Sequence, residues 1–293
     1  MSARKKNAVY GSSPIRDRRT RSDIEQIRRE LLRLAKENRP ATVRQIYYRA
    51  VSEGLIDKTE QEYKGTVCRL LADLRREGAL PYDWIADNTR WMRKPHTFDS
   101  LASALELTRQ TYRRALWTDQ EAYVEVWLEK DALSGVLFEV TSEWDVPLMV
   151  TRGYPSLTFL HSAAEVIAAQ EKPTFLYYLG DHDPSGVDIP KRVEAELRRM
   201  APFADIYFER LAVNVEQIAA FDLPTRPTKK SDSRAKAFEG ESVEVDAIAP
   251  AKLRELVNNA IVQHVDPTTY NRTLAVEEAE RQSLAAMIRA RVA

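Results

Sequence analysis

The chain is poor in cysteine, with Cys68 the only one among 293 residues. One cysteine cannot form an internal disulfide, and it excludes zinc sites built from several thiolates. Histidine is also scarce, and His96, His161 and His264 have no spacing typical of a metal site. These absences argue against a zinc-dependent module and leave oxygen ligands as the means of holding a metal ion.

Long apolar runs are absent as well. No window approaches the roughly 18 consecutive apolar residues that a membrane-spanning helix needs. The first residues, MSARKKNAVYGSS, are basic but lack the apolar core of a signal peptide. We therefore expect a cytoplasmic protein with no membrane partner. The sequence also has no Gly-x-x-x-x-Gly-Lys-Ser/Thr motif, which excludes a P-loop ATPase within it.

A formal net charge of zero hides an uneven distribution. Residues 1–95 carry 22 Lys and Arg against 13 Asp and Glu, so the rest of the chain carries 22 against 31. A basic N-terminal part joined to an acidic body predicts a polyanionic partner for the first part. The alternative is that charges on solvated helices segregate without any functional meaning.

The N-terminal third predicts helices. Residues 1–21 are polar and basic, as in a flexible arm. Apolar residues then recur at helical spacing after Asp23, a residue that favours the N-cap position. Pro40 interrupts this pattern, and Thr42 can cap a second helix, TVRQIYYRAVSEG.

A third helical pattern covers about residues 60–77 and stops at Gly78. The segment ALPYDWIADNTRW (79–91) then reads as a short strand, a turn and a second strand. Three helices followed by a β-wing predict a winged helix-turn-helix domain over residues 22–95. Most such domains bind DNA, although others are only protein interfaces.

Residues 96–120 predict a linker helix, running from about Ser100 to Trp117. Strand and helix patterns alternate after it, and a C-terminal helical extension completes a domain over residues 121–293. This alternation predicts an α/β fold, a parallel sheet with helices on both faces.

Three of the predicted strands end at candidate site residues: Glu129, the turn at Gly153, and the pair Asp181 and Asp183. Open parallel sheets place their sites at the carboxyl ends of the strands. Mg²⁺ favours carboxylate oxygens and is held by one or two of them beside a substrate phosphate. The alternative is a strand followed by an ordinary turn, because Asp, Pro, Ser and Gly all favour turns.

WLEK, ending in Glu129-Lys130, and GDHDPSG, containing Asp181 and Asp183, together resemble a Toprim domain, a Rossmann-like parallel-sheet fold. With GYPS (153–156), these motifs are similar to those of the A subunit of topoisomerase VI and its meiotic double-strand-break relatives. In that family a winged helix domain comes first and carries a nucleophilic tyrosine, which the segment VRQIYYRAV matches. The matches span about Thr42 to Val213.

The helical pattern separates the two tyrosines of that segment. An apolar stripe at i, i+3, i+4 and i+7 is formed by Val43, Ile46, Tyr47 and Ala50. Tyr48 lies outside the stripe and shares a face with Arg44. A guanidinium beside a phenol favours the phenolate and so lowers the pKa of the phenol from its usual value of about 10. The resemblance also points to Tyr48 and Arg44, whereas the alternative is that both tyrosines are packing residues.

The resemblance implies that Tyr48 attacks a DNA phosphorus and stays linked to the cut end. Glu129, Asp181 and Asp183 would hold Mg²⁺, which stabilises charge on the phosphate. It also implies a homodimer, in which the tyrosine of one subunit meets the metal site of its twin, and a separate ATPase subunit. The alternatives are a metal-dependent nuclease that does not use the tyrosine, and a noncatalytic DNA-binding protein.

Two groups of basic residues are candidates for contacts with DNA. One lies on the third predicted helix and the other in the polar segment 223–240: Lys64, Arg69, Arg75 and Arg76, and Lys229 and Lys230. Contacts of this kind to phosphates make affinity fall steeply with salt. The same residues could instead solvate a helix and a surface loop. Between the two aspartates, His182 is expected to be structural rather than a ligand.

Overall fold

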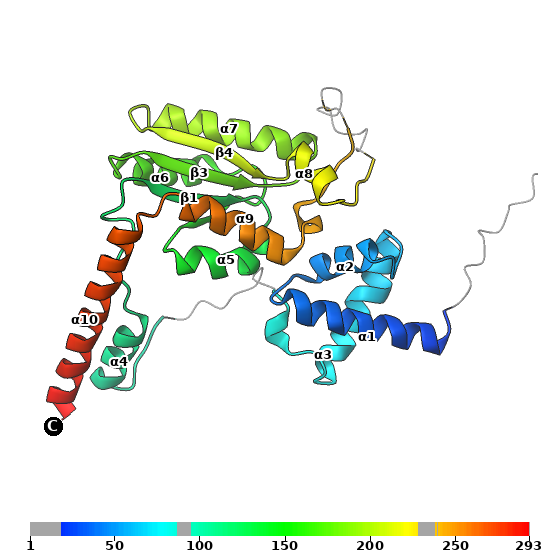
Figure 1. Cartoon of the computed structure of the whole chain (residues 1–293), viewed down its shortest axis with the longest axis horizontal. Helices are drawn as coiled ribbons and strands as arrows, with labels where there is room; N and C mark the ends of the chain where they lie inside the picture. Colours follow the sequence, from blue (N-terminus) through cyan, green and yellow to red (C-terminus); the bar gives the residue numbers. More distant parts are fainter. Residues whose placement is uncertain (1–18, 87–94, 228–237, 239, 293) are drawn as a thin grey trace, which may run out of the picture.

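The computed structural model of the chain describes residues 19–86, 95–227, 238 and 240–292. An N-terminal group of helices lies beside a larger α/β part that contains a four-stranded parallel sheet (Figure 1). Most of the predicted basic arm falls outside the described residues. In the described part of the chain, no helix has the length and apolar character needed to cross a membrane.

The N-terminal part consists of α1 (Arg21–Asn38), α2 (Val43–Ser52), the π-helical segment η1 (Glu62–Cys68) and α3 (Arg69–Arg76). The predicted cap at Asp23 is wrong, because Thr20 is the N-cap of α1. The Thr20 hydroxyl accepts from the Asp23 amide, and the Asp23 carboxylate accepts from the Thr20 amide. This reciprocal capping box lets the helix begin earlier than predicted. The cap of α2 at Thr42 is as predicted.

The third predicted helix forms, but its first part is π-helical, and Gly78 follows it with a φ of +77°. The first predicted strand of the wing is wrong. Tyr82–Trp84 instead forms a 3₁₀ turn (η2), and Ile85 makes one isolated bridge with Ala41. Turn hydrogen bonds to Pro81 and Tyr82 occupy the amides that a strand would offer to a neighbour. Residues 87–94 of this segment lie outside the described residues.

The sheet confirms the predicted parallel α/β arrangement. Its strands, in the spatial order β2-β1-β3-β4, are β1 (Tyr123–Leu128), β2 (Leu148–Val150), β3 (Thr174–Leu179) and β4 (Ile206–Ala212). All neighbouring pairs are parallel. Helices connect the strands, because parallel neighbours need crossovers rather than tight turns.

Two helical layers cover the sheet (Figure 1). One layer is α6 (Leu157–Ala168) and α7 (Pro184–Met200), which pack on Trp127 and Tyr178. The other is α5 (Ser134–Glu143) and α9 (Pro250–Val262), which belong to a second buried cluster. That second cluster also contains the core of α1, α2 and α3, so the N-terminal helices share a continuous apolar core with one face of the sheet.

The remaining helices are α4 (Leu101–Thr111), α8 (Val215–Ala220) and α10 (Pro267–Val292), with the 3₁₀ turns η3 (Asp131–Leu133) and η5 (Val245–Ala247). The predicted linker helix is shorter than expected and ends at Thr111. The segment after Thr111 is extended because its backbone groups bind residues outside the helix. Arg281 donates to the Tyr112 carbonyl, and the Leu116 amide donates to Asp145. α4 packs against α10.

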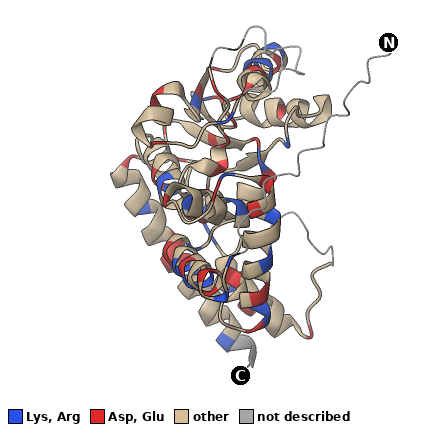
Figure 2. Cartoon of the chain, turned by 90° about the vertical axis from the view of Figure 1, so that its right-hand side faces the viewer, with Lys and Arg blue, Asp and Glu red and all other residues tan. Residues whose placement is uncertain are grey.

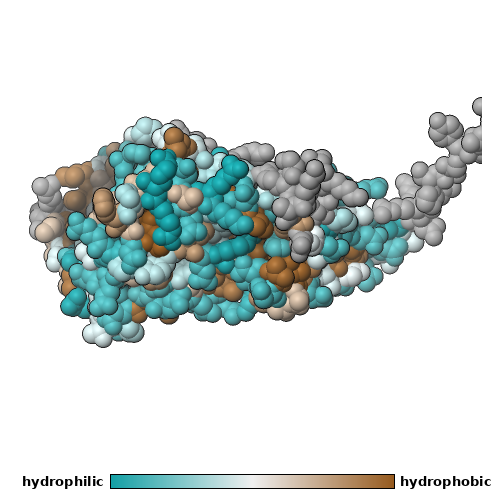
Figure 3. Space-filling model, turned by 90° about the horizontal axis from the view of Figure 1, so that it is seen from above, coloured by the Kyte–Doolittle hydropathy of each residue, from teal (hydrophilic) through white to brown (hydrophobic). Residues whose placement is uncertain are grey.

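The surface is mixed in character. Figure 2 shows basic and acidic residues interspersed along the helices, and Figure 3 shows hydrophobic residues in small separate patches. Residues 19–86 carry 14 Lys and Arg against 11 Asp and Glu. Most of the basic excess that the sequence places before residue 95 therefore lies outside the described residues.

A carboxyl group is buried inside the sheet at Glu125 of β1. Its side chain is 1% exposed and accepts hydrogen bonds from the Tyr123 hydroxyl (3.1 Å) and the Trp127 indole (2.8 Å). Burial raises the pKa of Glu125 to about 7, although both donors oppose that shift. The folded state therefore favours the protonated carboxyl group.

We expect Glu125 to lower the stability of the fold as pH rises. A raised pKa in the folded state means that its favourable contribution is complete below the unfolded pKa of about 4.5 and is lost towards pH 7. In the parent protein, the free energy of unfolding should fall by on the order of 3 kcal/mol between pH 4.5 and 7 because of this group. Glu125→Gln should abolish that fall. Urea unfolding of both proteins at pH 5 and pH 8 measures this, and parallel pH profiles would contradict it.

Candidate functional site

Two acidic residues meet where neighbouring strands end. Glu129 follows β1 and Asp181 follows β3, and the strands are in register at Leu128 and Leu179. The Asp181 amide donates a hydrogen bond of 3.2 Å to Glu129 Oε2. The structure therefore brings these two predicted residues together at the carboxyl edge. The turn at Gly153, with a φ of +86°, follows β2 on the other side of β1.

Asp183 starts the next helix. Its Oδ1 accepts from the Gly186 amide (2.8 Å) as the N-cap of α7, and its Oδ2 lies 4.0 Å from Arg226 Nη2. A side chain at Gly186 would collide with the Asp181 carbonyl. The short turn that places two carboxylates together thus requires glycine at 186.

Arg210 of β4 holds the loop that carries these aspartates. Its guanidinium donates to four backbone carbonyls, at distances between 2.6 and 3.1 Å: Gly180, Asp181, Gly186 and Val213. Sequence reasoning missed this residue. The only indication in the sequence is that a cationic residue lies within an otherwise largely apolar strand. That pattern does not reveal what the side chain binds.

Burial and mutual repulsion alter the protonation of the acidic edge. Burial, followed by the Asp181 charge, raises the pKa of Glu129 to about 7. Burial also raises the pKa of Asp181, and Lys130 opposes that shift. A cation placed between these carboxylates would relieve the repulsion.

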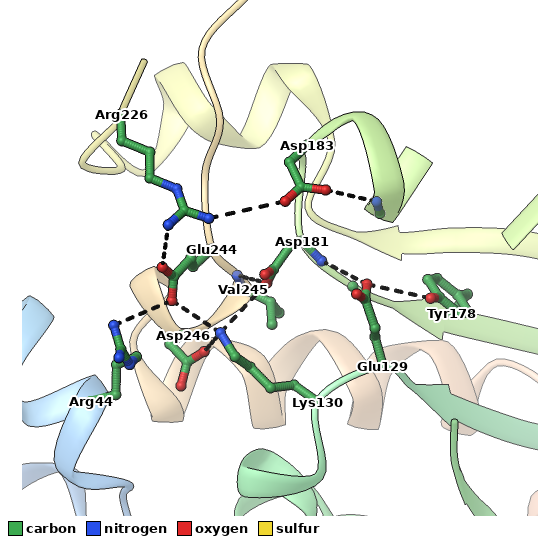
Figure 4. A network of polar contacts seen from close by, with 12 residues as sticks. Arg44, Glu129, Lys130, Tyr178, Asp181, Asp183, Arg226, Glu244, Val245 and Asp246 are labelled. Carbon is green, nitrogen blue, oxygen red and sulfur yellow. Dashed lines mark hydrogen bonds and ion pairs between the residues drawn. The ribbon is translucent and has the colours of Figure 1, made fainter. Parts of the chain in front are cut away.

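A second acidic pair, also missed by sequence reasoning, lies beside the first (Figure 4). Glu244 and Asp246 are in the VEVDAIAP segment, which returns to the sheet where Val243 forms a backbone bridge with His182. The Val245 amide donates to Asp181 Oδ1 (2.9 Å). The only sequence signal was the Glu-Val-Asp run between apolar residues.

Lys130 lies among three of these carboxylates (Figure 4). Its Nζ is 3.0 Å from Glu244 Oε2 and 3.8 Å from Asp181 Oδ1, and it also forms an ion pair with Asp246, which is 1% exposed. Burial acts against the ammonium, but the surrounding carboxylates raise the pKa of Lys130 above its usual value. Lys130 is therefore charged.

Glu244 connects the acidic edge to α2. It lies 3.0 Å from Arg226 Nη1 and 3.7 Å from Arg44 Nη1, in addition to its contact with Lys130. Burial disfavours its charge, but these cations lower the pKa of Glu244 below its ordinary value. Through Glu244, the predicted site residue Arg44 is held next to the carboxyl edge of the same chain.

The tyrosines differ from expectation. Tyr48 is 3% exposed and Tyr47 is 4% exposed, so both are buried although only Tyr47 belongs to the predicted apolar stripe. Burial, with the Glu244 charge, raises the pKa of Tyr48 well above its usual value despite Arg44. The expected shift towards the phenolate is therefore reversed, because α2 is covered on the side that faces η5 as well as on its own apolar stripe.

The predicted DNA-contacting residues lie on η1 and α3. The side chains of Lys64, Arg69 and Arg76 are 72%, 54% and 75% exposed and pair with acids on the same helical segment. Arg75 is half-buried, donates to the Leu71 carbonyl and lies over the Tyr82 ring. Lys229 and Lys230 lie outside the described residues.

The donor chemistry of the edge fits a hard cation. Mg²⁺ usually takes one or two carboxylates and completes its shell with water and phosphate. Within the described ranges, no three His, Cys, Asp or Glu side chains are arranged as a ready metal-binding group. Glu129 and Asp181 offer carboxylate oxygens of the kind that Mg²⁺ prefers, and Lys130 already places a positive charge 3.8 Å from Asp181 Oδ1.

Two comparisons with known proteins were negative. The sequence matches no protein-family model. It likewise matches no curated protein.

We expect Arg210→Gln to loosen the loop that carries Asp181. Loss of a half-buried cation leaves backbone carbonyls unpaired, which should cost about 3 kcal/mol of unfolding free energy. Hydrogen exchange at the amides of Asp181 and Gly186 should become faster. Arg198→Gln is the matched control, because Arg198 also donates to a backbone carbonyl, that of Ile206, but lies on the outer side of α7. Equal effects of the two changes would contradict the role given to Arg210.

Proposed function

We propose that this protein is a Mg²⁺-dependent DNA-cleaving transesterase that forms a phosphotyrosyl link through Tyr48. The observation that carries the proposal is the meeting of Glu129 and Asp181 at adjacent strand ends, beside the helix that bears Arg44 and Tyr48. An acidic edge suited to a cation and a helix suited to phosphate chemistry lie on either side of Glu244. A purely structural sheet would have no reason to bury carboxylates that repel each other.

The strand order supports a Toprim assignment for the α/β part. A glutamate follows the first strand, and an Asp-x-Asp pair follows its parallel neighbour, in agreement with the resemblance to the topoisomerase VI A subunit. The N-terminal helices are, on the same proposal, those of a winged helix-turn-helix domain.

In the proposed reaction, the Tyr48 oxygen attacks a backbone phosphorus, and the bond from phosphorus to the leaving sugar oxygen breaks. The phenol proton passes to water and the leaving sugar oxygen takes a proton from water, so that no net proton is gained or lost. Arg44 neutralises charge on the phosphate. Mg²⁺ held by Glu129, Asp181 and Asp183 would stabilise the leaving oxygen. Reversal of the same steps reseals the strand, because the phosphotyrosyl link keeps the energy of the broken bond.

The tyrosine must become accessible for this reaction. Tyr48 is buried, so DNA binding has to be accompanied by movement of α2 away from η5. On this proposal the active form is a homodimer on duplex DNA, in which Tyr48 of one subunit works with the acidic edge of its twin. A separate ATPase subunit would drive strand passage.

A metal-dependent nuclease that does not use tyrosine is the second candidate. The observation that favours it is the raised pKa and burial of Tyr48 in this structure. In this mechanism water replaces the tyrosine as the nucleophile, and the same acidic edge holds the cation. The products differ, because hydrolysis leaves ends that are not attached to protein.

A cleavage assay on supercoiled plasmid with Mg²⁺, stopped with detergent with or without protease, tests the proposal. We expect breaks linked to protein, reduced at least about a thousandfold by Tyr48→Phe because the nucleophile is lost. Asp181→Asn should reduce cleavage by a factor of about a hundred or more, because it removes charge from the cation site.

Tyr47→Phe is the matched control for Tyr48→Phe. Both tyrosines are buried on α2, and Tyr47 loses only its hydrogen bond to the Thr59 carbonyl. Free ends that disappear in Asp181→Asn but persist in Tyr48→Phe would instead establish the nuclease. DNA binding without cleavage in any combination would contradict both catalytic mechanisms and favour a noncatalytic DNA-binding protein.

A further inference from the structure

A cavity of about 240 Å³ lies between the N-terminal helices and the carboxyl edge of the sheet. Three of its lining residues, Arg44, Lys130 and Asp246, belong to the network drawn in Figure 4. Its lining includes Arg44, Tyr63, Arg75, Lys130 and Asp246. It is distinct from the edge between Glu129 and Asp181, because neither of those residues lines it.

The charges that face this cavity are mostly positive. Among its described lining residues, Arg44, Arg75 and Lys130 are cationic and Asp246 is acidic. These cations come from α2, α3 and the segment after β1, which are far apart in the sequence. Asp246 forms an ion pair with Lys130, which also pairs with Asp181 and Glu244 outside the cavity lining. The two guanidinium groups can attract an anion, and at Arg44 that anion would compete with Glu244, which lies 3.7 Å away.

Both guanidinium groups are held in place. The Arg44 group lies 4.3 Å from the centre of the Tyr63 ring, and Arg75 donates to the Leu71 carbonyl at 3.2 Å. Aromatic stacking and a backbone hydrogen bond reduce the conformational entropy that either side chain loses when it binds a ligand. The N-terminus of α2, at Thr42 and Val43, also lines the cavity, and its backbone dipole favours negative charge.

We propose that this cavity is a binding site for one backbone phosphate of DNA, gripped by Arg44 and Arg75. The size suits a phosphate with its adjoining sugar, and planar guanidinium groups bind phosphate oxygens in pairs. That the anion is part of DNA rests on the proposed function; that the cavity binds a phosphate rests only on its lining. A phosphate here would lie beside Lys130, and through it next to Asp181.

The proposed phosphate site gives different roles to Arg75 and Arg76, which the sequence analysis treated alike. Arg75 faces the cavity, whereas Arg76 is 75% exposed and lies 3.5 Å from Asp73 on its own helix. A diffuse electrostatic contact with DNA would depend on both residues about equally. A built phosphate site depends on Arg75 alone.

Binding of a short duplex DNA to the full-length protein, followed by fluorescence anisotropy at several salt concentrations without Mg²⁺, tests the proposal. We expect Arg75→Gln to weaken binding about tenfold and to lower the salt dependence by about one phosphate contact. Arg76→Gln should weaken binding less than about twofold. Arg75→Lys keeps the charge but not the planar guanidinium group, so its affinity should lie between those of the other two variants. All three variants should keep the melting temperature of the parent.

Inorganic phosphate alone provides the second arm. It should compete with the duplex for the parent protein and for Arg76→Gln, and compete at least about fivefold less well for Arg75→Gln. Equal losses in Arg75→Gln and Arg76→Gln, or competition unchanged by Arg75→Gln, would overturn the phosphate site. If the chain proves not to cleave DNA but Arg75→Gln still abolishes phosphate competition, the site stands and the proposed function fails.

Discussion

Carboxylates that repel one another are held at low exposure at the carboxyl edge of the sheet, and the cations that neutralise them join the parts of the molecule. Lys130 lies among Asp181, Glu244 and Asp246, and Arg210 ties the aspartate loop to β4. Removing Lys130 would leave buried carboxylates without a partner, which costs far more than the loss of a surface pair, and removing Arg210 would leave backbone carbonyls unpaired. The ion pair between Glu244 and Arg44 then extends this network to α2. The packing of the N-terminal helices therefore depends on the same charges as the candidate site.

This arrangement explains why Tyr48 is not a ready nucleophile in the structure. The helix that carries it packs against η5, and the carboxylate of Glu244 adds to the effect of burial in favouring the neutral phenol. Under the proposed transesterification, the approach of DNA would have two consequences. A phosphate near Arg44 would compete with Glu244 for the guanidinium, and release of that pair would free α2 to expose its tyrosine. Substrate binding and activation would then be linked through one carboxylate.

The order of strands and helices could be predicted from the sequence because each element carries its own local signal. Apolar runs such as FLYYL mark buried parallel strands, and Thr42 and Ser156 mark helix starts where their side chains do accept capping hydrogen bonds. Parallel pairing then places Glu129 and Asp181 at one edge without further information. The first predicted strand of the wing was wrong for a local reason too, since the amides of Trp84 and Ile85 are bound within a 3₁₀ turn. A pattern of aromatic residues does not distinguish that turn from a strand.

The partners of those residues were decided by tertiary structure alone. Glu244 lies 114 positions after Lys130 and 200 after Arg44, and nothing in the local pattern around VEVD shows that its carboxylates return to the strand ends. Helical spacing correctly placed Tyr48 beside Arg44, yet the effect on the phenol was reversed, because burial depends on what covers the helix and not on the helix itself. The sequence alone therefore determined which residues end the strands, because local propensity and the alternation of strands and helices are both visible in it. Charge, protonation and access at the site arise from long-range packing, which one-dimensional periodicity does not encode.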